Sequence, residues 1–239
     1  MDEVYAYIMT FDTGFAPCIY DGKLDIACCK TNLRYKVAKN LQNNVENIWV
    51  IGVIGKVMAK RHKIENSFLY RPIYVAKFTK SSFVTTKDYF SEDGLRTDQK
   101  FGYLYKNDTW YIRKGNPHGE KKCNKNLVKI DFKSSNNCIK NDIFYRYREG
   151  SPLKENYVLI TDDFLYYGKD YYQLELPDSL MKQIKEKLER APRSLAKIQT
   201  SNNELEKIIN STKRTKSLSE EAYIDDFFVK NEKRCKSCN

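Results

Sequence analysis

The sequence predicts an α+β protein in which a β-rich N-terminal core is followed by C-terminal helices. Over the first 176 residues, short runs rich in β-branched and aromatic residues alternate with turn residues, which is typical of strands. After Pro177, apolar residues recur at helical spacing instead. We therefore predict two units: a β-rich domain over residues 1–176, and a helical extension over residues 177–239 that ends in a basic tail containing cysteines.

The β-rich unit contains strand patterns and two short helix patterns. The run over residues 47–56 is almost entirely apolar, and its glycines, Gly52 and Gly55, indicate a bulge or the close approach of another backbone. Strands around such a run could close into a small barrel-like mixed sheet. Strands are predicted over residues 4–11, 23–29, 47–56, 71–79, 127–132 and 157–167. A short helix or turn is predicted over 32–40, and a helix over 85–92 with Thr86 as its cap.

The extension carries two or three helix patterns. One helix is predicted to begin at Asp178 and to end near Pro192. Capping-box patterns at residues 201–204 and 217–220 precede further apolar positions. These apolar stripes can cover the protein's own β core, which is the commoner use, or residues 178–228 can dock a protein partner or a second copy of the chain.

Positive charge is concentrated in one segment of a chain whose formal net charge is +11. Residues 100–148 hold twelve Lys and Arg against four Asp and Glu, interleaved with aromatic residues. Cations can contact phosphates and aromatic faces can stack on bases, so the segment predicts a nucleic acid or nucleotide partner. Arg113 and Lys114 are the phosphate-binding candidates, and Trp110 and Tyr111 are the stacking candidates. A solvated, lysine-rich loop region is the alternative.

The composition also indicates a compartment and excludes several classes of enzyme. No stretch has the length of apolar sequence that a membrane helix needs, and acidic Asp2 and Glu3 stand where a signal peptide carries positive charge. Seven cysteines, an odd number, fit reduced thiols, so we expect a cytoplasmic protein without a membrane association. The sequence lacks a P-loop, a dinucleotide fingerprint, a nucleophile-elbow serine motif and a zincin motif.

Five residues are expected to line one ligand pocket. Lys30 and Arg34 follow an apolar run and would hold a phosphate. Asp12 and Asp98 lie in turn-rich segments and would accept a proton or bind a metal. His118 lies in an Asn-Pro-His-Gly turn and would be the titrating group.

The cysteines raise two further questions. Cys18, Cys28 and Cys29 are candidate nucleophiles, because a nearby cation or helix N-terminus can favour the thiolate. A free cysteine is more commonly a small buried hydrophobe, so their role stays open. Cys235 and Cys238 form a C-x-x-C pair without an orthodox second pair, so no metal site is predicted, and the sequence indicates no particular cofactor.

Several separated motifs stand out between about residues 4 and 175. They are Asp-Thr-Gly-Phe-Ala-Pro (12–17), Ala-Cys-Cys-Lys (27–30) with Arg34, Ile-Trp-Val-Ile-Gly (48–52), Asn-Pro-His-Gly (116–119) and Tyr-Val-Leu-Ile-Thr-Asp-Asp-Phe-Leu-Tyr-Tyr-Gly (157–168). Together these motifs resemble the family called nucleotide modification associated domain 2. The chain has Glu46 and Asn47 where that family is expected to have a Gly-Asp pair before the tryptophan-containing strand. The resemblance implies an association with phage and bacterial systems that modify nucleic-acid bases, and implies no particular chemistry.

These observations predict a protein that binds nucleic acid or nucleotides in a DNA base-modification or phage-defence system. One alternative is a transferase or hydrolase that modifies a nucleotide or base at the same pocket. A second alternative is a subunit that docks a partner through its C-terminal helices.

Overall fold

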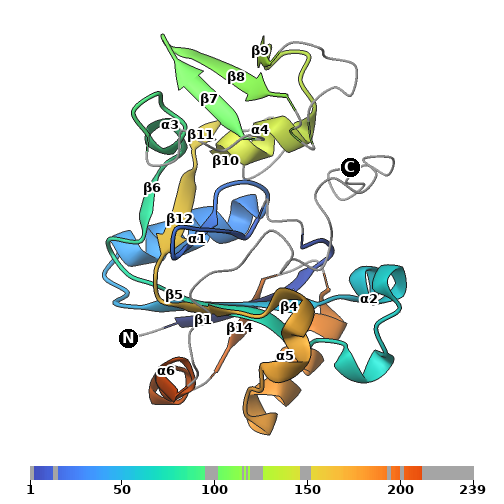
Figure 1. Ribbon diagram of the computed structural model, residues 1–239. Helices are drawn as coiled ribbons and strands as arrows, with labels where there is room; N and C mark the ends of the chain where they lie inside the picture. Colours follow the sequence, from blue (N-terminus) through green and yellow to red (C-terminus); the bar gives the residue numbers. More distant parts are fainter. Residues whose placement is uncertain are drawn as a thin grey trace.

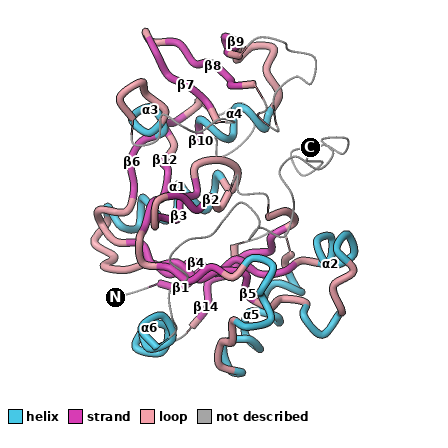
Figure 2. Tube along the Cα trace, viewed as in Figure 1, coloured by secondary structure: helices cyan, strands magenta, loops and turns pink. Residues whose placement is uncertain are grey.

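The computed structural model contains helices and strands in similar proportion, arranged in layers (Figures 1 and 2). The β-rich core and the C-terminal helices are both present, which confirms the predicted α+β class. The structure describes residues 3–12, 16–94, 102–114, 116, 118, 126–145, 152–192, 195–199 and 202–211.

A central five-stranded sheet with the order β13-β5-β4-β1-β14 organises the fold. Strands β1 and β4 are parallel and are connected through helix α1, whereas the other pairs are antiparallel. Every residue of β4 is buried, as its apolar sequence predicts. The strands of this sheet are β1 (Glu3–Met9), β4 (Ile48–Ile54), β5 (Pro72–Phe78), β13 (Phe164–Tyr166) and β14 (Ala196–Ile198), and the helix is α1 (Thr31–Gln42).

A second, four-stranded sheet lies on the α1 side of the central sheet, with the order β2-β3-β12-β6. Asp162 and Asp163 interrupt the last strand pattern, so that β12 joins this sheet while β13 joins the central one. The barrel-like closure that the sequence left possible is not formed, because the described strands make several open sheets and no closed barrel. The second sheet contains β2 (Cys18–Tyr20), β3 (Lys23–Ile26), β6 (Phe83–Thr85) and β12 (Tyr157–Thr161).

A third layer covers the second sheet and contains much of the basic segment. Its aromatic and aliphatic residues, including Tyr89, Tyr103, Trp110 and Ile143, pack with Cys28 and Val158 into a core of their own. In Figure 1 its three-stranded sheet lies at the opposite end of the molecule from the C-terminal helices. The layer contains α3 (Thr86–Tyr89), β7 (Tyr103–Lys106), β8 (Thr109–Arg113), β9 (Leu127–Lys129), α4 (Asn137–Ile143), β10 (Phe144–Tyr145) and β11 (Lys154–Glu155).

The C-terminal segment covers the other face of the central sheet (Figure 1). Leu180, Ile184 and Leu188 of α5 (Asp178–Arg190) are buried against the chain's own core, as are Leu205 and Ile209 of α6 (Asn202–Ser211). Strand β14 pairs with β1, so this segment also completes the central sheet. The boundary at residue 176 stays a prediction, and the third helix pattern at residues 217–228 lies outside the described residues.

Two local details refine the predictions. The cap of α3 is Thr85 rather than Thr86, because the Thr85 side chain accepts a hydrogen bond from the Asp88 N–H. The register between β4 and β5 shifts at Gly52, which confirms the predicted irregularity. The remaining helices are α2 (Lys56–His62) and two 3-10 turns, Asn66–Phe68 and Gly168–Gln173. Within the described residues, no helix combines the length and hydropathy that crossing a membrane requires.

Candidate active site

A strained turn between β3 and α1 positions Cys29. Cys29 and Lys30 have φ values of 54° and 43°, which are left-handed values that side chains rarely adopt. Each such residue costs about 1–2 kcal/mol and persists only where the surroundings hold it. The turn presents the half-buried Cys29 immediately before the N-terminus of a twelve-residue helix. This strand–turn–helix arrangement resembles the elbow on which other enzymes mount a nucleophile.

Arg34 holds this turn against α4 and β12. Its buried guanidinium donates to the carbonyl of Cys29 at 2.8 Å and to that of Tyr157 at 2.7 Å. It also donates to the carbonyls of Asn141 and Asp142 at 3.1 and 2.8 Å. Arg34 was expected to hold a phosphate, but a fully buried guanidinium that serves four main-chain carbonyls of its own chain is placed to position the turn instead.

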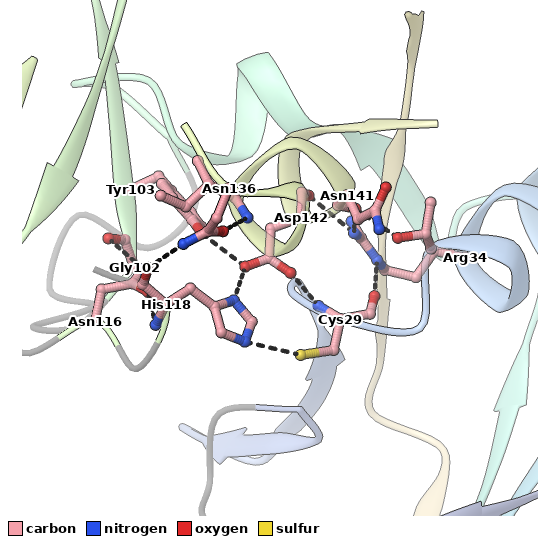
Figure 3. A network of polar contacts seen from close by, with 11 residues as sticks. Cys29, Arg34, Gly102, Tyr103, Asn116, His118, Asn136, Asn141 and Asp142 are labelled. Atoms are coloured by element: carbon pink, nitrogen blue, oxygen red, sulfur yellow. Dashed lines mark hydrogen bonds and ion pairs between the residues drawn. The ribbon is translucent and has the colours of Figure 1, made fainter. Parts of the chain in front are cut away.

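Cys29, His118 and Asp142 come together from three separate segments (Figure 3). The Cys29 Sγ lies 3.8 Å from the His118 Nε2, and the His118 Nδ1 lies 2.6 Å from the Asp142 Oδ2. Because a carboxylate can only accept, the Nδ1 donates to Asp142, which leaves the Nε2 to accept the thiol proton. A thiol, an imidazole and an orienting carboxylate in this order are the parts of a cysteine catalytic triad.

The imidazole is fixed by its surroundings as well as by Asp142. The Asn116 side chain accepts a hydrogen bond from the His118 N–H at 2.9 Å and donates to the Gly102 carbonyl at 3.2 Å. The Asn136 side chain donates to the His118 carbonyl at 3.1 Å while it caps α4. His118 is 7% exposed, so the turn holds the predicted histidine inward rather than at a solvated rim.

Asp142 is buried and accepts three hydrogen bonds. Besides His118, the Tyr103 hydroxyl donates to its Oδ2 at 2.6 Å and the Cys29 N–H donates to its Oδ1 at 2.6 Å. Burial alone would raise the pKa of Asp142, but its electrostatic interaction with His118 and these hydrogen bonds hold that pKa below its usual value. Asp142 is therefore an anion that orients His118 and ties the Cys29 turn to α4.

Cys28 differs from its neighbour Cys29 in burial and in the state of its thiol. It is fully buried among apolar side chains, and burial raises the pKa of its thiol well above the usual value. Such a thiol stays protonated and unreactive. Cys29, which is half-buried and faces the imidazole, is the nucleophile candidate of this pair.

A metal ion is a weaker interpretation of the same group. The ligand atoms of Cys29, His118 and Asp142 lie within 4.8 Å of one another. However, both Asp142 oxygens already accept N–H or O–H donors, and the His118 Nδ1 is directed at one of them. Only the Cys29 thiol and the His118 Nε2 of this group lie outside the hydrogen bonds to the Asp142 carboxylate, whereas catalytic zinc sites have three protein ligands.

Asp12 and Lys30 lie beside the end of β1. The Tyr166 hydroxyl donates to the Asp12 Oδ2 at 2.6 Å, and Asp12 is buried. The Lys30 ammonium donates to the Ile8 carbonyl at 3.1 Å and lies 4.3 Å from the centre of the Tyr7 ring. Lys30 thus borders the Cys29 turn, while Asp12 belongs to a buried hydrogen-bonded group on the central sheet.

The remaining candidates have no hydrogen bond to Cys29, His118 or Asp142 among the described residues, or lie outside those residues. Trp110 is 5% exposed and packs between Phe90 and Phe144, so its ring is in the core and not available for stacking on a base. Tyr111 and Arg113 are partly exposed and Lys114 is exposed, all on or after β8. Asp98 lies outside the described residues.

Sequence reasoning missed Asp142, which lies in the Lys- and Asn-rich segment that was interpreted as loops around one strand. The apolar positions Ile139 and Ile143 around it form the buried face of α4. That spacing, preceded by Asn136 as a cap, is the signal that could have identified a short helix with Asp142 on its inner side.

Comparison with known proteins identifies the family and no nearer relative. No curated protein and no solved structure matches the chain. The sequence profile of nucleotide modification associated domain 2 matches residues 1–226, which extends the resemblance beyond residue 175 into the C-terminal segment. The matched range spans the positions of Cys29, His118 and Asp142. The chain therefore belongs to the nucleotide modification associated domain 2 family.

Proposed function

We propose that this chain is a thiol-dependent transferase or hydrolase that acts on a nucleotide or a nucleic-acid base in a DNA base-modification or phage-defence system. The single observation that carries the proposal is the Cys29–His118–Asp142 arrangement on a strained strand–turn–helix. The family supplies the nucleotide-modification setting.

The reaction begins with proton transfer from the Cys29 thiol to the His118 Nε2. The sulfur then forms a bond to an electrophilic carbon of the substrate, such as an acyl carbon, and the bond to the leaving amine or alcohol breaks. His118 delivers its proton to that leaving group. Water or an acceptor amine attacks the thioester, which releases the product and returns the proton to sulfur. Asp142 orients the imidazole and stabilises its charged form.

Binding of nucleic acid or a nucleotide without chemical change is the second candidate function. The exposed Lys114, the partly exposed Arg113 and the basic composition of residues 100–148 favour it. Such binding would depend strongly on salt, because cations on a protein displace counterions from phosphates.

Incubation with nucleotides and DNA in a lysate extract, followed by mass analysis of both ligand and protein, tests the two candidates. The enzyme proposal predicts a mass change in the ligand, together with a covalent adduct on Cys29. Cys29→Ser should lose both signals and keep its fold. Cys138→Ser is the matched control, because Cys138 is also a partly exposed free thiol on the α4 side of the site.

A mass change that survives in Cys29→Ser would contradict the thiol mechanism. Salt-sensitive binding with an unchanged ligand mass, equal in the wild type and Cys29→Ser, would establish the binding function in its place.

A further inference from the structure

We infer that the exposed cations of α2 and its C-cap (Lys56, Lys60, Arg61 and Lys63), together with Lys30, bind the phosphate groups of the substrate beside the Cys29 site. The inference rests on the proposed function, because it specifies how a nucleotide would lie at that site. The ligand chemistry is a phosphate ester, supplied by a free nucleotide or by a strand.

Two cations bracket the end of β1. The Lys30 ammonium donates to the carbonyl of Ile8, and the Arg61 guanidinium donates to the carbonyl of Thr10 at 3.4 Å. Residues two positions apart along an extended chain are about 7 Å apart, so both cations border the same short stretch of chain. Lys30 directly follows Cys29 in the sequence, so this group of cations begins beside the candidate nucleophile.

Helix α2 and its C-cap add exposed lysines next to these two cations. Lys56 and Lys60 are four residues apart, which places them on one side of the helix, and the exposed Lys63 follows the helix as its C-cap, with a φ of 55°. Met58 and Ala59 are buried on the opposite side. Residues 55–64 contain no acidic residue, so the lysines are not neutralised within the helix.

The position of α2 is fixed relative to the site. The Gly55 N–H donates to the Met9 carbonyl at 3.2 Å, which ties the start of α2 to the end of β1 (Figure 1). A Cβ at Gly55 would lie 2.3 Å from the Ile8 side chain, so only glycine allows this close approach. The Arg61 guanidinium lies 3.9 Å from the centre of the Phe11 ring, where its plane is held beside the β1 end.

This geometry has a consequence for substrate recognition. Two exposed lysines on one side of α2 and a third at its C-terminal end attract a polyanion, and an arginine on an aromatic ring offers a planar donor set to a phosphate. The basic segment at residues 100–148 is a separate source of charge in the sequence. The cations of α2, with Lys30 and Lys63, therefore contact the phosphates in addition to any contact made by residues 100–148.

The test compares two double variants of equal charge change. Lys60→Glu with Lys63→Glu reverses two of the exposed lysines of α2 and its C-cap, and Lys182→Glu with Lys185→Glu reverses two exposed lysines on α5, which covers the other face of the sheet. Binding of a labelled single strand of about 12 nucleotides is measured by fluorescence anisotropy across a range of salt concentrations. Nucleoside 5′-monophosphates are tested as competitors.

The α2 variant should weaken binding about tenfold at low salt and lower the salt slope by about 1.4, the value for two lost phosphate contacts on a single strand. The α5 variant should retain affinity within about twofold. Competition by monophosphates identifies a single phosphate as the ligand, whereas dependence on strand length identifies a strand. Equal effects of the two variants, or no binding by the wild type, would overturn the inference.

Failure of this inference is distinguishable from failure of the proposed function. The α2 variant should retain the wild-type alkylation rate of Cys29, because α2 contributes no residue to the Cys29–His118–Asp142 group. Cys29→Ser should retain wild-type strand binding. If the α2 variant binds normally while Cys29→Ser has lost turnover, the phosphate surface is wrong and the thiol mechanism stands.

Discussion

Replacement of Asp142 by Asn tests how far the site depends on one buried carboxylate. Asp142 is 1% exposed and accepts hydrogen bonds from the Cys29 N–H, the Tyr103 hydroxyl and the His118 Nδ1. An asparagine has nearly the same shape, but one of its two terminal groups is an NH₂ donor. Whichever way the amide is turned, at least one of the three donors then faces another donor.

The magnitude follows from the number of donors left without an acceptor. A buried donor that loses its partner costs about 1–3 kcal/mol, and bonds to a charged acceptor lie at the upper end of that range. We therefore expect Asp142→Asn to lower the free energy of unfolding by about 2–4 kcal/mol at neutral pH. That is a large part of the roughly 5–15 kcal/mol by which folded domains are stable.

The stability that the Asp142 carboxylate contributes depends on pH, and the direction of that dependence follows from its pKa. The folded-state pKa of Asp142 is lowered, so its carboxylate binds protons less tightly in the folded state than in the unfolded chain. Its contribution is present above the unfolded pKa of about 3.9 and is lost as the pH falls through the lower, folded value. The stability difference between wild type and Asp142→Asn should therefore narrow below about pH 4.

Urea unfolding monitored by tryptophan fluorescence at neutral and acidic pH measures both effects. Asp162→Asn is the control, because Asp162 is exposed and should change stability by less than about 0.5 kcal/mol. A difference for Asp142→Asn below about 1 kcal/mol, or one that stays constant with pH, would refute the reasoning that three donors converge on an ionised Asp142.

Three other substitutions or modifications test separate parts of the structure. Arg34→Lys keeps a positive charge but cannot donate to four carbonyls, so we expect urea unfolding to show a loss of about 2–4 kcal/mol in the free energy of unfolding. A loss below about 1 kcal/mol would contradict the role of Arg34 in holding the turn. Gly52→Ala places a Cβ 2.3 Å from the Tyr74 ring, which should cost about 1–3 kcal/mol in thermal unfolding, and an unchanged melting temperature would show that the ring moves aside. Iodoacetamide should modify Cys29 in the folded protein and reach Cys28 only after denaturation, as peptide mass analysis can show, because burial keeps the pKa of Cys28 high. Labelling of both at similar rates in the folded state would contradict that difference.

Much of the fold was predictable from local pattern. The apolar run at β4, the helical spacing after Asp178 and the bulge at Gly52 each reflect a single element and its burial. The sheet partners were not predictable in the same way. Strand β14 pairs with β1 from almost two hundred residues away, and the break at Asp162 sends two halves of one pattern into different sheets.

In the site, too, residues in local motifs were predictable, whereas contacts between distant segments were not. Lys30, Arg34 and His118 were selected from sequence, and the structure places all three at or beside the Cys29 turn. Asp142 was not selected, because its role depends on a contact with Cys29 across 113 positions of the chain, and the local helix signal around Asp142 does not reveal that role. Arg34 was selected for its charge, whereas its burial gives it a different task, and burial is a property that only the assembled fold fixes.

The most direct test of the central claim is the alkylation rate of Cys29 as a function of pH, in the wild type and in His118→Gln. A free cysteine ionises near pH 8.5, and a thiol beside an imidazole and a helix N-terminus forms its reactive thiolate at lower pH. We expect the wild type to react rapidly at neutral pH and the variant to react more slowly, with its profile displaced to higher pH. Superimposable profiles would show that His118 does not act on the Cys29 thiol and would contradict the proposed mechanism.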